Sequence, residues 1–80
     1  MKAVEYSKQH RELKDAVITD IKTLVGKKKV KFDEPFADEV NNDVYAVDAD
    51  SVYFNGTMER YPIHDLGILD AILIVSLLEK

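Results

Sequence analysis

The C-terminal stretch of the chain, residues 66–78, is apolar on every side if it forms a helix. Only Gly67, Asp70 and Ser76 interrupt a run of leucine, isoleucine, valine and alanine. A helix without a polar face must be covered all round, and an 80-residue chain has few layers with which to cover it. A helix needs about 20 apolar residues to span a bilayer, and this run is shorter and contains Asp70. The stretch therefore predicts a buried helix, with a second protein surface as a candidate cover.

The length of the chain allows one domain, residues 1–80, with a thin margin of stability. A domain of this size buries roughly 60% of the surface that its unfolded chain exposes, so association would widen the margin. There is no cysteine, which removes disulfides, thiolate metal sites and thiol nucleophiles. The first residues are polar and lack the apolar core of a secretory signal. Together these features favour a cytoplasmic location.

The first third of the chain predicts an amphipathic helix from about Ala3 to Val25, because apolar side chains recur every three or four residues. Gly26 is placed to end this helix, and the lysines around it lie beside the negative end of the helix dipole. The predicted apolar stripe consists of Tyr6, His10, Leu13, Val17, Ile21 and Leu24, widened by Ala16, Ile18 and Val25.

Short strands are predicted in the middle of the chain. The first covers residues 28–32 and is ended by Asp33-Glu34-Pro35, after which residues 36–43 form a loop that tucks Phe36 and Val40 under the domain. Two β-branched and aromatic runs, 44–47 and 51–54, form a hairpin. Asn55-Gly56 then predicts a type I′ turn into a last strand, 57–61, which Pro62 ends or confines to a sheet edge.

The last helix could begin near Asp65 or just after Gly67. The second choice is preferred because it makes Gly67 the N-cap and puts Asp70 in the first turn, where a carboxylate favours the positive helix end. The predicted fold is α+β in two layers: an N-terminal helix, a small antiparallel sheet of three or four strands in a hairpin meander, and a C-terminal apolar helix.

No pattern of residues predicts an enzyme, a cofactor or a metal site. Asp48-Ala49-Asp50 resembles the start of a calcium loop, but an oxygen ligand and a glycine are missing at the next required positions. His10 and His64 stand far apart, outside any zinc-ligand spacing. The three glycines form no phosphate-binding loop. We therefore expect no catalytic, cofactor-binding or metal-ligating residues.

The charges divide along the chain, with a net of +5 over residues 1–31 and −9 over residues 32–80. The two parts can neutralise each other within one fold, or align a second molecule. A cluster of five lysines offers an alternative function as a weak nucleic-acid binder. The low isoelectric point and the acidic remainder of the chain argue against it. The lysines are Lys22, Lys27, Lys28, Lys29 and Lys31.

The sequence thus favours a non-enzymatic protein-interaction domain that associates with itself, most simply as a homodimer. The last helix presents three arcs of apolar side chains, of which a sheet and the first helix can bury two. We predict that the third arc, Ile68, Ile72 and Val75, forms the interface.

Overall fold

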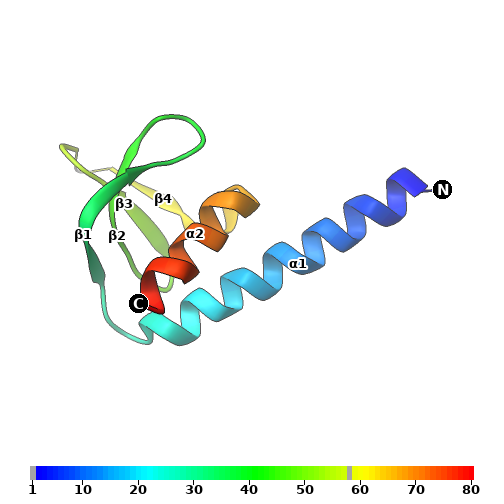
Figure 1. Cartoon of the computed structure of the whole chain (residues 1–80), viewed down its shortest axis with the longest axis horizontal. Helices are drawn as coiled ribbons and strands as arrows, with labels where there is room; N and C mark the ends of the chain where they lie inside the picture. Colours follow the sequence, from blue (N-terminus) through cyan, green and yellow to red (C-terminus); the bar gives the residue numbers. More distant parts are fainter. Residues whose placement is uncertain (1, 58) are drawn as a thin grey trace.

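Two helices pack against one face of a four-stranded antiparallel sheet (Figure 1). The structure, a computed structural model, describes residues 2–57 and 59–80, with side chains from residue 9 onward. The strands lie in the order β1-β2-β3-β4, so β1 and β4 are the edges. This confirms the predicted α+β fold. The elements are α1 Lys2–Val25, β1 Val30–Ala37, β2 Asp43–Val47, β3 Ser51–Phe54, β4 Arg60–Pro62, a 3₁₀ turn η1 Ile63–Asp65, and α2 Ile68–Leu78.

The core lies between the helices and the sheet. Each layer contributes fully buried side chains, with Ile21 from α1, Ile74 from α2 and Val47 from β2 among the largest. Ile63 closes the core from η1. Burial of a side chain of this size contributes about 1.5–3 kcal/mol, so these few residues account for much of the stability of a small domain.

The predicted first helix and its end are confirmed, but only part of its predicted apolar stripe is buried. Gly26 has a φ of 61° and donates its N–H to the carbonyl of Lys22 over 3.0 Å, as a helix-ending glycine does. The side chains that enter the core are Ile18, Ile21 and Val25. Leu13 and Leu24 are instead 54% and 43% exposed.

The physical reason is that the predicted stripe is wider than the buried face of α1. At about 100° per residue, Leu13 and Leu24 lie at the far edge of the stripe, and Val17 lies between them and the core-facing residues and is partly buried. The helix also extends beyond the sheet toward its N-terminus (Figure 1), and residues 9–13 are all exposed. Only the C-terminal half of α1 therefore has a core to cover.

Strand β1 continues to Ala37. The prediction that Asp33-Glu34-Pro35 ends this strand is therefore wrong. Lys31 pairs with Ala46 and Phe36 pairs with Val44, so residues 32–35 lie opposite Tyr45 alone in a large bulge. An edge strand with a bulge tolerates proline because no ladder hydrogen bond is lost there. Phe36 packs against the core as predicted.

The loop after β1 exposes Val40, contrary to the prediction that it tucks under the domain. Its side chain is 73% exposed. Asp38 explains the shape of this loop, because its carboxylate accepts the N–H groups of Val40 and Asn42, each over 2.9 Å. A loop tied to a carboxylate in this way does not need an apolar anchor.

The predicted type I′ turn at Asn55-Gly56 is also wrong. Such a turn needs a positive φ at both central residues, and among the described residues other than glycine only Asn41 has one. Gly56 does have a φ of 81°. The N–H of Asn55 donates to the carbonyl of Asp43 over 2.6 Å, which ties the end of β3 to β2. Strand β4 begins later than predicted and reaches Pro62 at the sheet edge.

Helix α2 begins at Ile68 with Gly67 as N-cap, as preferred from the sequence. Asp70 lies in its first turn and is only 7% exposed. It does more than favour the helix end, because it accepts the N–H of Glu39 over 3.2 Å and so joins α2 to the β1–β2 loop. Within the described part of the chain, no helix is long and apolar enough to cross a membrane.

Candidate functional site

Helix α2 exposes an apolar stripe on the side opposite its buried face. The buried face consists of Asp70, Ala71 and Ile74. Leu69, Ile72 and Leu73 are 68%, 46% and 39% exposed. Their spacing of three and four residues places them on one side of the helix. We call Leu69, Ile72 and Leu73 the α2 stripe.

The α2 stripe includes one of the three residues predicted for an interface. Ile72 lies in it, whereas Ile68 and Val75 flank it and are half-buried, Val75 against the core. Leu69 and Leu73 were not predicted. Since every side of this helix is apolar, its sequence contains no periodicity that tells the exposed side from the buried one.

The face of the sheet away from the helices carries an aromatic and basic cluster. Tyr45 from β2 and Tyr53 from β3 have ring centroids 6.4 Å apart. The Nζ of Lys29 lies 3.9 Å from the ring centroid of Tyr53 and 5.2 Å from that of Tyr45. It also donates to the Tyr45 hydroxyl over 3.3 Å. Lysine and both rings are thus in cation–π contact on this open face.

Two more cations belong to the same face because of the strand register. Lys31 pairs with Ala46, Ala46 with Tyr53, and Tyr53 with Arg60, which makes one row across all four strands. Partners directly opposite each other in an antiparallel sheet share a face. The row therefore has a cation at each edge of the sheet and a tyrosine between them. We call Lys29, Lys31, Tyr45, Tyr53 and Arg60 the tyrosine face.

Asp48 anchors Tyr53 from the β2–β3 turn. One carboxylate oxygen accepts the N–H groups of Asp50 and Ser51 over 2.8 and 2.7 Å, and the other accepts a hydrogen bond from the Tyr53 hydroxyl. Burial opposes ionisation of Asp48, but these hydrogen bonds outweigh it and lower its pKa below 3.8. The hydrogen bond to Asp48, together with burial, raises the pKa of Tyr53 above 10.0.

The predicted lysine cluster is divided by the fold. Lys22 points to η1, where its Nζ lies 3.2 Å from the Nε2 of His64. Lys29 lies over the tyrosines, and the others are exposed around the α1–β1 connection and on β1. The structure thus separates Lys22 from the group and adds two aromatic rings and Arg60 to it. The lysines at the connection and on β1 are Lys27, Lys28, Lys29 and Lys31.

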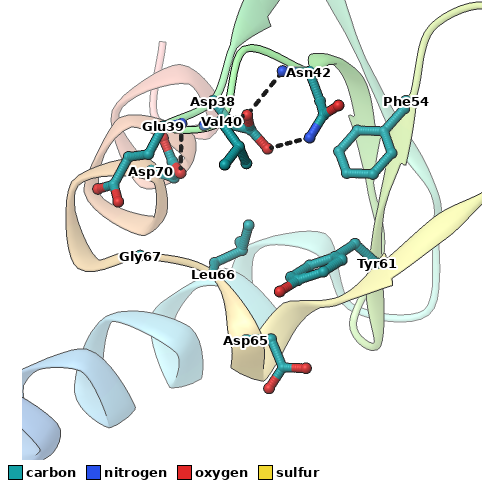
Figure 2. A pocket seen from close by; sticks show the side chains of 10 residues that line it. All are labelled: Asp38, Glu39, Val40, Asn42, Phe54, Tyr61, Asp65, Leu66, Gly67 and Asp70. Carbon is teal, nitrogen blue, oxygen red and sulfur yellow. Dashed lines mark hydrogen bonds between the residues drawn. The ribbon is translucent and has the colours of Figure 1, made fainter.

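A small acidic pocket of about 160 Å³ lies between the β1–β2 loop, β4 and the start of α2 (Figure 2). Its two buried carboxylates, Asp38 and Asp70, point to loop N–H groups and accept them (Figure 2). Phe54 and Tyr61 form an aromatic wall, with ring centroids 6.3 Å apart. The buried acids therefore hold the loop in place, which gives them a structural role.

The acidic turn at residues 48–50, which resembles the start of a calcium loop, has a structural role. The carboxylate of Asp48 is occupied by its own turn and by Tyr53. Among the described residues, no group of three or more histidines and acids is placed to hold a metal ion. No protein-family model, curated protein or solved structure matches the chain. The α2 stripe and the tyrosine face are the two surfaces of this chain that indicate a function.

Proposed function

We propose that the protein is a non-enzymatic interaction domain that forms a homodimer through the α2 stripe. The observation that carries the proposal is the exposure of three large apolar side chains on one side of a helix. Contiguous exposed apolar side chains are a common mark of protein–protein interaction sites. The absence of cysteine fits a reducing compartment, so we include a cytoplasmic location in the proposal.

A second copy of the chain is the occupant that the stripe favours. Within α2 the one charged side chain, Asp70, lies on the buried face. Two copies of the stripe can therefore meet about a two-fold axis without bringing like charges together, and such an interface uses the same surface on both copies. Exposed Leu13 and Leu24 on α1, the helix that packs against α2, can extend the contact.

The size of the stripe predicts weak association. Burying what remains exposed of its three side chains would contribute about 2–4 kcal/mol for each copy. Association costs about 4–15 kcal/mol in lost freedom of motion. At the favourable end, two copies contribute about 8 kcal/mol against a cost of about 4 kcal/mol. This difference corresponds to a dissociation constant on the order of 1 mM for the stripe alone, with tighter binding if α1 takes part.

Sedimentation equilibrium from about 10 to about 500 μM tests the proposal, because the average mass should rise toward that of a dimer over this range. The double substitution Leu69→Glu and Ile72→Glu places two charges in the stripe and should keep the protein monomeric. Both side chains are exposed, so the variant should still fold, which circular dichroism checks.

Thr19→Glu is the matched control for added negative charge. Thr19 is exposed on α1, outside the apolar arc of Leu13 and Leu24, so its variant should dimerise like the original protein. A monomeric original protein at the highest concentration would overturn the proposal. So would a double variant that dimerises normally.

A further inference from the structure

We propose that the tyrosine face binds single-stranded nucleic acid, with its two rings stacking on bases and its three cations contacting phosphates. Val47 and Val52, the neighbours of Ala46 and Tyr53 along their strands, belong to the core shared with the helices, whereas Tyr45 and Tyr53 do not. Because side chains alternate along a strand, the tyrosine face lies on the side of the sheet away from the helices. It is therefore a separate site, and it can be occupied in a monomer or a dimer.

The rings lie where a base could reach them. Tyr45 and Tyr53 stand on β2 and β3, the two central strands, and neither helix covers that side of the sheet. An open four-stranded sheet with aromatic rings can stack two or three bases. Stacking on an aromatic ring is tolerant of sequence because every base has a flat face.

The cations lie on both sides of the rings. Lys31 is on the β1 edge and Arg60 on the β4 edge of the row that contains Tyr53. Three strand spacings separate these edges, or about 14 Å. A single strand that crosses the sheet would thus have a cation for a phosphate on each side of the stacked bases.

Lys29 takes part in both the stacking and the phosphate contacts of the proposed site. Its ammonium group covers the ring of Tyr53 at 3.9 Å and belongs to an exposed, flexible side chain. A phosphate that draws this group away would leave the ring free for a base. Lys27 and Lys28, exposed in the connection just before it, add further positive charge.

The negative charge of the rest of the chain limits the affinity and sets the conditions for the test. The protein has a net charge of −4, and Asp48 lies beside Tyr53, although its carboxylate is occupied by hydrogen bonds. With about three phosphate contacts, the logarithm of the binding constant should fall with the logarithm of salt concentration with a slope of about −2. Binding should therefore weaken about 20-fold between about 50 and about 200 mM salt.

Fluorescence anisotropy with labelled oligothymidine and oligouridine of about 12 nucleotides tests the proposal, since this length covers the face. The protein should bind one or both at low salt and bind a duplex of the same length more weakly. Comparison of the two probes distinguishes a DNA ligand from an RNA ligand. No binding of either probe at about 50 mM salt would overturn the proposal.

Two matched pairs of variants separate this site from general charge attraction. Tyr45→Leu should weaken binding about tenfold, whereas Tyr45→Phe keeps the ring and should bind nearly as well.

The second pair of variants tests the contribution of charge. Lys31→Gln should make the salt slope shallower by about 0.7. Arg11→Gln removes the same charge from the exposed part of α1 and should leave the slope unchanged. Equal effects of the Lys31 and Arg11 variants, or normal binding by Tyr45→Leu, would contradict the assignment.

Discussion

At the scale of single residues, carboxylates hold the loops of this protein in place. Asp38 accepts two N–H groups in the β1–β2 loop, and Asp48 accepts two in the β2–β3 turn. Asp70 joins the first of these loops to α2. The geometry of a short loop leaves several backbone N–H groups without a carbonyl group in reach, and an ionised carboxylate accepts several of them at once. Part of the chain's acidity therefore has a structural cause.

Asp48→Ala should lower the free energy of unfolding by about 1–3 kcal/mol at neutral pH, because two backbone donors and the Tyr53 hydroxyl lose their acceptor. Tyr53→Phe removes only one of these hydrogen bonds and should cost about 0.5–1.5 kcal/mol. Urea unfolding of both variants beside the original protein measures the difference. Equal stability of all three proteins would show that the turn does not depend on Asp48.

The contribution of Asp48 to the free energy of unfolding should decrease in acid. The pKa of Asp48 is lower in the folded chain than its ordinary value of 3.8. The folded protein therefore binds fewer protons than the unfolded one in acid, and ionised Asp48 stabilises it fully above that value. As the pH falls from there through the lowered pKa, the stability difference between the original protein and Asp48→Ala should shrink.

At the scale of elements, the sequence predicts an element well where one local signal decides it. Gly26 ends α1 and Gly67 precedes α2 as expected, and the β2–β3 hairpin lies where its aromatic and β-branched runs place it. The end of β1 was missed because Asp33-Glu34-Pro35 has the composition of a turn. At a bulged sheet edge, the same residues remain in a strand.

The side of an element that is buried was harder to predict than the element itself. The predicted stripe of α1 satisfies helical spacing across its whole width, and only packing in the fold decides which part of it is buried. The tyrosine face depends on register, since Lys31 and Arg60 come beside Tyr53 only through the pairing of four strands. Lys29 was predicted as part of a basic cluster, but its contact with the rings required the fold.

The buried and exposed edges of the α1 stripe should respond differently when a side chain is shortened to alanine. Ile21→Ala removes a fully buried side chain and should lower the free energy of unfolding by about 2–5 kcal/mol. Leu13→Ala removes a side chain that is 54% exposed and should cost no more than about 0.5 kcal/mol in a monomer. Denaturant titrations of dilute protein compare the two, and similar losses would show that Leu13 also packs in the monomer.

At the scale of the whole molecule, association and stability should be linked. A domain of this size has little stability to spare, and a partner that binds only the folded chain raises the melting temperature with concentration. We therefore expect the midpoint of thermal unfolding to rise by a few degrees between dilute and near-millimolar protein. The Leu69→Glu, Ile72→Glu variant should melt at one temperature throughout, and a concentration-independent midpoint for the original protein would argue against the dimer.

The bulge in β1 also affects how this chain avoids the wrong kind of assembly. β1 is the longest strand and lies at a sheet edge, where an unpaired row of N–H and C=O groups can recruit further strands into a fibril. The bulge at residues 32–35 leaves only two paired residues on each side of it, and Pro35 has no N–H to offer. The bulge and the proline therefore disfavour cross-β growth at this edge, which favours association through the helices over association through strands.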